Sequence, residues 1–338
     1  MIAIRSSYSR FIRYMIADDL NPVVETLQQA RSIGIFCHIR PDGDALGSLL
    51  GLGLSLRAMN KAVRFFSADG LPLAYRFLPE GNLVECPPAS PPDCERIVVV
   101  DTSTQERVGS VFQTWNRQVD INLDHHVSNT RFGLINIIRP DLAASALLVQ
   151  EIIENAGWPM SPAIAANLYV GVSTDTGSFR HSSVTAEVFR AAARLVDAGA
   201  NPTELARQCY RSVALRRFEL ARLAMQTMKL ECDNQLAYVQ ITPEMFQASG
   251  ALPEDSEGLI EKLQELAPVC VAAVFESAEN SLRVSLRSKG NVDVNALAAR
   301  FGGGGHPAAA GIRVSGPPEI NREKILESLR AAFTASPL

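Results

Sequence analysis

The sequence lacks any apolar stretch approaching the roughly 20 residues that a membrane-spanning helix needs, so no membrane association is expected. Its six cysteines include no C-x-x-C pair and lie far apart, which argues against a disulfide or zinc framework. They are expected to be reduced thiols of a cytoplasmic protein. An excess of positive charge is also absent, because the formal net charge is −4. Long nucleic acid is therefore not an expected partner, although a local basic pocket for a small anionic substrate is compatible with this charge.

What is present fits a folded protein of two domains. The chain has 338 residues, which is long for one domain, and its 47% hydrophobic and 20% charged residues are typical of globular proteins. Residues 1–20 are expected to form a disordered tail or the lead-in to a helix. The stretch "MIAIRSSYSRFIRY" is compatible with a targeting segment or with a natural start at Met15, and no apolar core of signal-peptide length follows it.

Apolar strand-like runs alternate with helical patterns through the first 200 residues. The strand-like runs are "IGIFCH" (33–38), "RIVVVD" (96–101) and "VDINLD" (119–124), and the helical stretches are "DALGSLLGLGLSLRAMN" and "AASALLVQEIIENAG". Near-continuous hydrophobicity in strands that alternate with helices predicts an α/β domain over residues 1–200, with a parallel sheet and helices on both faces. In such sheets, ligands bind outside the carboxyl ends of the strands.

The pattern changes after residue 200. Residues 201–230 predict a helical linker that opens at Asn201-Pro202. The runs "LAYVQIT", "VCVAAVFES" and "SLRVSLRS" then predict strands, with helices at 256–267 and about 320–333. Residues 231–335 are thus expected to form a second, smaller α/β domain with a mixed sheet.

Acidic residues and histidines gather where the predicted strands and helices end. They are His38, Asp42 and Asp44 in "HIRPDGDALGS", Asp101 after "RIVVV", Asp124, His125 and His126 in "LDHH", and Asp175 in "STDTG". Each has a structural alternative when taken alone: Pro-Asp-Gly is turn chemistry, and Asp44 could simply cap the following helix. Coincidence of them all at element ends favours one site.

Imidazoles mixed with several carboxylates are the ligand set of a divalent metal, and Mn²⁺ fits it best. Six such ligands exceed the needs of one ion. Two ions about 3.5–4 Å apart that share a bridging carboxylate would use them all.

A second candidate site lies near a run of four glycines that comes directly before His306. Glycine leaves no side chain, so the backbone N–H groups of such a run can approach a phosphate closely. Arg283 and Arg287 lie four residues apart on a predicted strand and should share a face. The alternatives are a flexible turn between a helix at 292–301 and the strand "GIRV", and solvation of one arginine.

Four motifs, in the order "HIRPDGDALGS", "VVVDTS", "NLDHHVSN" and "GVSTDTGSF", resemble those of the DHH phosphoesterases. The stretch "RFGGGGHPAAAG" (300–311) resembles the glycine-rich signature of the DHH-associated C-terminal domain. The length and layout most resemble the nanoRNase class. Its members are bifunctional oligoribonucleases that also remove the 3′-phosphate of 3′-phosphoadenosine 5′-phosphate.

The resemblance implies a metal site, catalytic residues and substrate contacts. One Mn²⁺ would be held by His38, Asp42 and Asp101, and the other by Asp44, Asp101, His125 and Asp175, with Mg²⁺ or Co²⁺ as substitutes. Asp101 would bridge the ions, Asp124 would orient a histidine, and His126 would contact the scissile phosphate or protonate the leaving oxygen. The expected substrate contacts are Arg283, Arg287, Ser288, Gly303, Gly304, Gly305 and His306.

The implied reaction is attack by activated water, giving 5′-mononucleotides from short oligoribonucleotides and AMP from 3′-phosphoadenosine 5′-phosphate. The main alternative is a phosphodiesterase for linear or cyclic di-adenylate. A single-strand exonuclease would call for a more basic surface. A non-catalytic nucleotide-binding module would be supported by the loss of metal ligands, and none is missing. Substrate preference, cleavage direction and a possible homodimer stay open.

Overall fold

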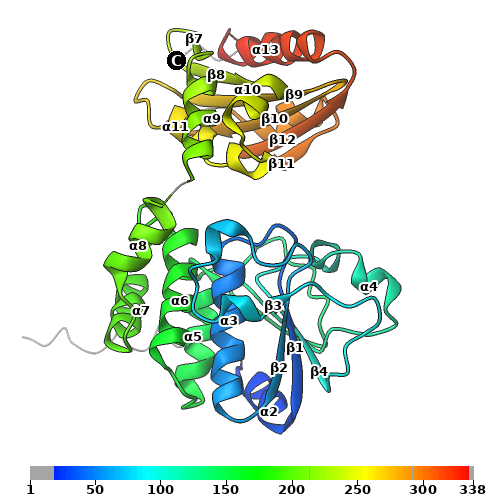
Figure 1. Cartoon of the computed structure of the whole chain (residues 1–338), viewed down its shortest axis with the longest axis vertical. Coiled ribbons are helices and arrows are strands. Elements are labelled where there is room, and N and C mark those ends of the chain that lie inside the picture. Colours follow the sequence, from blue (N-terminus) through cyan, green and yellow to red (C-terminus); the bar gives the residue numbers. More distant parts are fainter. Residues whose placement is uncertain (1–18, 213, 291, 335–338) are drawn as a thin grey trace, which may run out of the picture. The chain divides into compact units, whose positions relative to one another are not determined.

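The computed structural model describes residues 19–212, 214–290 and 292–334 (Figure 1). They form two compact units, which divide after Ser212. Residues 1–18 of the predicted tail lie outside the described residues. Each unit contains a six-stranded sheet, which confirms the predicted α/β class. The predicted domain ranges, 1–200 and 231–335, fall within the two units.

The sheet of the first unit is entirely parallel, as predicted. Its strands are β1 (Ser32–Phe36), β2 (Ala62–Phe66), β3 (Val84–Glu85), β4 (Arg96–Val100), β5 (Ile121–Asp124) and β6 (Ile135–Ile138). Their order is β3-β2-β1-β4-β5-β6, so the chain reverses direction across the sheet between β1 and β4. A crevice at such a switch point is where ligands bind in open α/β sheets.

Both faces of this sheet are covered. One shares a hydrophobic core with α2 (Asn21–Gln29), α3 (Gly43–Ala58), α5 (Ser145–Asn155), α6 (Pro162–Asp175), α7 (Ala186–Asp197) and α8 (Pro202–Tyr210). The other packs against η4 (Gln105–Val108) and α4 (Val111–Thr114). Strand β1 shows why both are needed: Ile33 and Ile35 are buried on the first face and Phe36 on the second. The short helices η2 (Leu73–Tyr75) and η3 (Gly81–Leu83) belong to the segment that connects β2 to β3 along the chain.

The glycines of α3 let it approach α6 closely. Gly47 and Gly51 lie four residues apart, on one face of the helix. A Cβ at Gly47 would collide with the carbonyl oxygen of Asn167, and a Cβ at Gly51 would lie 2.5 Å from a methyl carbon of Leu168. The glycine-punctuated sequence is therefore a helix–helix contact surface, and it fixes the start of α3 beside the end of α6.

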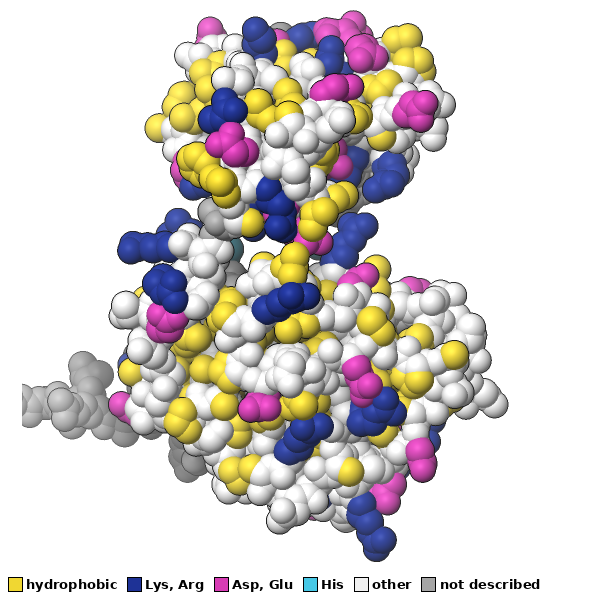
Figure 2. Space-filling view, viewed as in Figure 1, with side chains coloured by type: hydrophobic (Ala, Val, Ile, Leu, Met, Phe, Trp, Pro, Cys, Tyr) yellow, Lys and Arg dark blue, Asp and Glu magenta, His cyan; other side chains and the backbone are white. Residues whose placement is uncertain are grey.

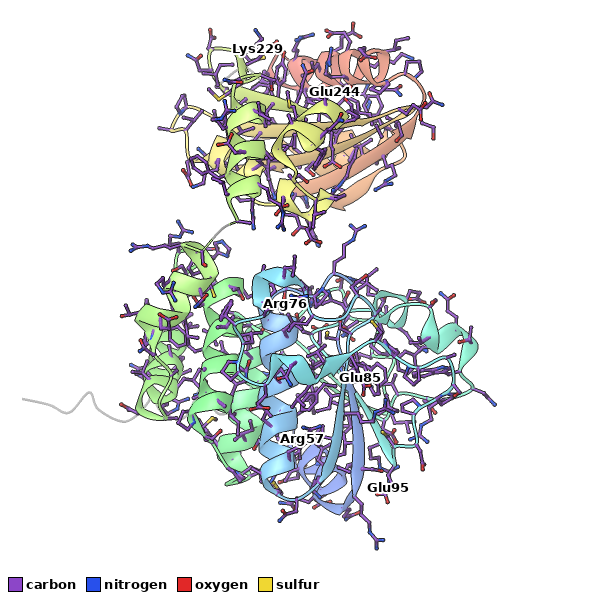
Figure 3. The ribbon with its side chains drawn as sticks, in the orientation of Figure 1. Arg57, Arg76, Glu85, Glu95, Lys229 and Glu244 are labelled. Carbon is purple, nitrogen blue, oxygen red and sulfur yellow. The ribbon has the colours of Figure 1, made fainter. Side chains whose placement is uncertain are left out.

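The other end of α3 is tied to β2 through Arg57, which Figure 3 labels on this helix. Its Nη2 donates to the carbonyl of Val63 at 2.6 Å, and its guanidinium lies 4.8 Å from the centre of the Phe65 ring. Helix α3 is thus anchored along its length.

The second unit has a mixed sheet, as predicted. Its strands are β7 (Lys229–Glu231), β8 (Leu236–Ile241), β9 (Val271–Ala278), β10 (Ser281–Ser288), β11 (Gly304–His306) and β12 (Ala309–Ser315), in the order β11-β12-β10-β9-β8-β7. The pair β8–β9 is parallel, and the other pairs are antiparallel. One face packs against α9 (Leu215–Met225), α10 (Pro243–Ser249) and α11 (Leu259–Gln264), and the other against α12 (Val294–Ala299) and α13 (Pro318–Thr334). The short helix η5 (Pro253–Ser256) contacts α9.

The prediction of continuous helix over 201–230 was wrong. Helix α8 ends at Tyr210, α9 begins at Leu215 and β7 begins at Lys229. The predicted start is correct, because the Asn201 side chain accepts a hydrogen bond from the N–H of Glu204 at 3.2 Å. The break has a physical reason: α8 packs into the first core, whereas Leu220 of α9 is buried in the core of the second unit.

All six cysteines are free; Cys37 and Cys94 are buried, and Cys86 is exposed. No helix among the described residues is long and apolar enough to span a membrane. Basic and acidic side chains are interspersed on the face shown in Figure 2, where they form no continuous basic stripe.

Candidate metal centre and active site

The six predicted metal ligands all lie at or just beyond the ends of strands or helices of the first unit. They are His38 after β1, Asp42 and Asp44 at the start of α3, Asp101 after β4, His125 after β5 and Asp175 at the end of α6. The carboxyl ends of β1, β4 and β5 adjoin one another in the sheet, because β1 pairs with β4 and β4 with β5. The fold therefore brings these residues together.

His38, Asp42 and Asp101 form one group of possible metal ligands, with donor atoms within 4.8 Å of one another. The Nε2 of His38 lies 3.5 Å from Asp101 Oδ2 and 3.9 Å from Asp42 Oδ1. The other ring nitrogen, Nδ1, donates to the carbonyl of Ile39 at 2.8 Å. That hydrogen bond fixes the tautomer in which Nε2 offers a lone pair to the centre of the group.

Asp44, His125 and Asp175 form a second such group. The Nε2 of His125 lies 3.4 Å from Asp175 Oδ2 and 3.9 Å from Asp44 Oδ2. Its Nδ1 faces the carbonyl of Leu142 at 3.2 Å, so this ring also directs Nε2 toward the carboxylates.

Asp101 belongs to the first group and also to a third, with His125 and His126, so it links the two halves of the cluster. Its Oδ2 is 3.5 Å from His38 Nε2, and its Oδ1 is 3.6 Å from His125 Nε2. The backbone of Asp101 is left-handed, with φ of 50°, and its N–H donates to the carbonyl of Leu123 at 2.9 Å. Aspartate tolerates this conformation better than most residues. The sharp turn after β4 therefore presents both oxygens of one buried carboxylate to two different histidines.

Helix α5 holds two of these carboxylates through its first residues. The N–H groups of Ser145 and Ala146 donate to the two oxygens of Asp44, at 2.6 and 2.9 Å. The hydroxyl of Ser145 donates to Asp101 Oδ1 at 2.9 Å. Sequence reasoning missed Ser145, although a serine at the start of the predicted helical stretch "AASALLV" was the available signal. The positive end of the helix favours a carboxylate here.

The cap of α3 is Asp42, and the suggestion that Asp44 caps this helix was wrong. The Asp42 Oδ1 accepts hydrogen bonds from the N–H groups of Asp44 and Ala45, both at 3.0 Å. Asp44 lies two residues further on, in the first turn of α3, where its side chain meets the start of α5.

The carboxylates of the cluster oppose one another's ionisation. Burial raises the pKa of Asp44 well above its ordinary value, and the charges of Asp101, Asp175 and Asp42 raise it further. Burial also raises the pKa of Asp175, to about 6. Burial acts against ionisation of Asp101 too, but its contact with His38 and the nearby His125 hold its pKa below the ordinary value. A cation at the centre would relieve this repulsion.

The donor geometry fits a metal ion. Histidine and carboxylate donors face one another at 3.4–3.9 Å, which is too long for a good hydrogen bond. Two ligands that each lie about 2.0–2.2 Å from one ion are separated by about 3–4 Å. Together with the two oriented Nε2 atoms, this spacing means that the cluster could hold a divalent metal.

A buried polar network supports the remaining histidine. The Nδ1 of His126 lies 2.7 Å from Asp124 Oδ1, and the amide of Asn129 donates to Asp124 Oδ2 at 2.6 Å. That amide also contacts Asn122 Oδ1 at 2.9 Å. Asp124 therefore orients His126, and its Nε2 is left for another partner. Asn129 was quoted within a motif but was not singled out from the sequence.

The candidate substrate residues lie in the second unit. Arg283 and Arg287 are half-buried on one face of β10, as predicted, and each faces a carboxylate at 3.6 Å, Glu276 and Glu261 respectively. Ser288 is buried on the opposite face, where its hydroxyl accepts the N–H of Gly290 at 3.1 Å.

The glycine run forms strand β11 and the turn before it. A Cβ at Gly303 or Gly305 would collide with backbone oxygens of β12, so these glycines are needed for close strand pairing. A Cβ at Gly304 would meet only the side chain of Asn295, at 3.9 Å, and both Gly304 and His306 are exposed. Phosphate binding by this run stays a prediction.

The two family models that match this chain each lie within one of its two units. The family model described as "DHH family, N-terminal domain" matches residues 32–172, and the one described as "DHHA1 domain" matches residues 233–335. The bifunctional oligoribonuclease and PAP phosphatase NrnA of Thermus thermophilus is 33% identical over 318 residues, which cover 92% of this chain and 94% of that protein. The Bacillus subtilis protein of the same name is 26% identical over 305 residues, covering 89% and 95%.

Among solved structures, an exopolyphosphatase-related protein from Bacteroides fragilis superimposes with a TM-score of 0.84. It is 25% identical, over 93% of this chain and 97% of that chain. RecJ from Thermus thermophilus in complex with Mn²⁺ has a TM-score of 0.53 at 15% identity, over 96% of this chain and 56% of that one. The likeness to RecJ shows a similar fold and no more.

Proposed function

The chain belongs to the DHH family of phosphoesterases and is a hydrolase of phosphoester bonds, and from this we propose that its substrates are short oligoribonucleotides and 3′-phosphoadenosine 5′-phosphate. The products would be 5′-mononucleotides and AMP. Support comes from relatives named for both activities, which match this chain over most of its length. Its free thiols suit the cytoplasm, where we expect the protein to act.

The observation that carries the mechanism is the position of Asp101 between His38 and His125. We propose that Asp101 bridges two Mn²⁺ ions, one also held by His38 and Asp42 and the other by Asp44, His125 and Asp175. Such ions, when bound, supply a nucleophile at neutral pH and neutralise phosphoryl oxygens. Ser145 would keep the bridging carboxylate in place by its hydrogen bond to Oδ1.

His126 is the residue we assign to the leaving group. Its Nδ1 is held by Asp124, so its Nε2 is the nitrogen able to contact the scissile phosphate or to protonate the leaving oxygen. The contact with Asp124 raises the pKa of His126, although burial opposes this. A raised pKa favours the protonated ring, which a general acid needs.

The second unit would bind the substrate. We assign this role to Arg283, Arg287, Gly303, Gly304, Gly305 and His306. Ser288, which was also predicted, is left out because its side chain is buried on the opposite face of β10. Arginine and histidine side chains suit a phosphate, and a glycine-rich strand leaves room for a flat base. Few phosphate contacts are on offer, so turnover should fall beyond about five nucleotides and depend weakly on salt.

A product assay with Mn²⁺ tests the proposal. It compares a dinucleotide, a 24-mer, 3′-phosphoadenosine 5′-phosphate and cyclic di-adenylate. We expect rapid release of 5′-mononucleotides from the dinucleotide, release of AMP from the bisphosphate, and slow turnover of the other two. Preference for cyclic di-adenylate would replace the proposal with a di-adenylate phosphodiesterase. Equal rates on the dinucleotide and the 24-mer, with a steep salt dependence, would indicate a single-strand exonuclease.

A further inference from the structure

Part of the second sheet presents an ordered surface built from matched rows of residues. In antiparallel strands, directly opposed residues project to the same face of the sheet. Three rows cross β10, β12 and β11 in this way: Arg283–Arg313, Ser285–Gly311–Gly304 and Arg287–Ala309–His306.

These rows lie on the face of β10 that its apolar residues do not use. Leu282, Val284 and Leu286 of β10 are buried with residues of α12 and α13 on the other face. On the face of the rows, Arg313, Gly311, Gly304 and His306 are exposed. The middle row has no side chain larger than serine, so it forms a flat floor between two rows that carry basic or imidazole groups.

The first row sets two arginines directly opposite each other. Like charges at such a position destabilise a sheet unless something neutralises them. Arg283 has Glu276 at 3.6 Å, but the Oε2 of Glu276 also accepts the hydroxyl of Ser256 at 3.1 Å. Arg313 makes no ion pair with any of the described residues. Within the described part of the chain, Glu276 thus pairs with Arg283 alone, and the two arginines of the row keep a net positive charge.

We propose that Arg283 and Arg313 form an anion site for a phosphate of an oligonucleotide strand, separate from the site at Arg287 and His306. This rests on the proposed function and deepens it. Arg287 lies four positions after Arg283 on β10, so the backbones of the two rows are about 13 Å apart at about 3.3 Å per residue. Stacked nucleotides repeat about every 3.4 Å, so this separation exceeds one nucleotide.

The consequence is a difference between the two substrate classes. Both phosphates of 3′-phosphoadenosine 5′-phosphate belong to one nucleotide, so this molecule engages one row only. A strand of four or five nucleotides reaches both rows across the floor. Arg313 would therefore contribute to binding of the longer substrate and not to hydrolysis of the shorter one.

The test is Arg313→Gln in the full-length protein, assayed with a pentanucleotide and with 3′-phosphoadenosine 5′-phosphate. We expect KM for the pentanucleotide to rise about tenfold with kcat little changed, because a remote phosphate contact stabilises ground and transition states alike. The salt dependence of log KM should become shallower by about 0.7, which is one phosphate contact on a single strand. Turnover of the bisphosphate should match wild type, which also shows that the variant is folded.

Two variants control for charge alone. Lys324→Gln removes an exposed positive charge from α13, on the opposite face of the same sheet, and should leave both substrates unaffected. Arg313→Lys keeps the charge and should recover part of the pentanucleotide affinity. An equal change on both substrates, or no change on either, would overturn the anion site while leaving the proposed function intact. Failure of the wild-type protein to hydrolyse either substrate would instead overturn the proposed function, and the inference with it.

Discussion

Asp124 Oδ1 lies 2.7 Å from His126 Nδ1, and the carboxylate that makes this contact is completely buried. Its other oxygen accepts the Asn129 amide at 2.6 Å, so the carboxylate cannot turn away from the ring. A buried acid held on both sides can fix the orientation and the tautomer of the imidazole.

Asp124→Asn should therefore lower kcat at least about 100-fold, the usual contribution of a general acid, while KM changes little. Steady-state kinetics on 3′-phosphoadenosine 5′-phosphate measure both parameters. Metal content should stay at the wild-type value, because Asp124 belongs to none of the three groups of possible metal ligands. Loss of bound metal in this variant would show that Asp124 acts by holding the ions instead.

Asp101→Asn should abolish hydrolysis of every substrate alike, because in the proposed mechanism this one carboxylate serves both ions. Asparagine tolerates the left-handed backbone at this position, so the variant should fold better than Asp101→Ala. Metal analysis should give two Mn²⁺ per wild-type chain and at most one in the variant. A single tightly bound zinc in the wild-type protein would refute the shared-carboxylate mechanism.

Gly47→Ala should destabilise the first unit and impair activity together. The added methyl group would collide with the carbonyl of Asn167, and overpacking of this kind costs about 1–3 kcal/mol. Each kcal/mol lowers the melting temperature by about 2–4 °C in a unit of this size. The matched control is Gly157→Ala in the same unit, where a Cβ meets nothing within 4 Å and only the left-handed backbone (φ of 64°) resists it. The control should keep wild-type activity. Equal loss of activity in both variants would argue against the idea that the α3–α6 contact positions the site residues.

Without metal, the protein should become less stable as the pH rises. Asp44 and Asp175 have raised pKa values, with that of Asp175 at about 6, so the folded chain binds protons more strongly than the unfolded chain between about pH 4 and 6. Stability contributed by these protons is lost as the pH rises through this window. His38 and His126 act in the same direction at higher pH, because their pKa values are also raised.

Calorimetry of dialysed, metal-free protein should show a melting temperature a few degrees lower at about pH 8 than at about pH 5.5. Added Mn²⁺ should reverse this order, since metal binding requires deprotonated ligands. A metal-free melting temperature that rises over this range would mean that other groups dominate the titration. Asp101 contributes with the opposite sign, but its lowered pKa places that effect at more acidic pH.

The cluster of histidines and carboxylates was predictable because its residues follow apolar runs, and parallel strands align their carboxyl ends. His38, Asp101 and His125 needed no more than this rule. Ser145 could not be found in the same way, since its contacts with Asp44 and Asp101 depend on where α5 begins relative to the sheet. The sequence gives no reason to single out Arg313, because its position opposite Arg283 depends on the pairing of β10 with β12. The end of α8 at Tyr210 could not be predicted either, because residues that favour helix continue beyond it. The two helices differ only in that α8 packs into the core of the first unit and α9 into the core of the second.

The contact between α3 and α6 has a consequence for how the protein should respond when the proposed ions are removed. Gly43 lies against Thr174, Gly47 against Gly171 and Gly51 against Leu168, so the helices run in opposite directions and bring Asp44 and Asp175 to the same end. These ligands are positioned by an apolar core that needs no ion, in contrast to small domains that fold only around a metal. Chelation should therefore silence the enzyme without unfolding it, and activity should return as fast as the ions do, with no refolding delay.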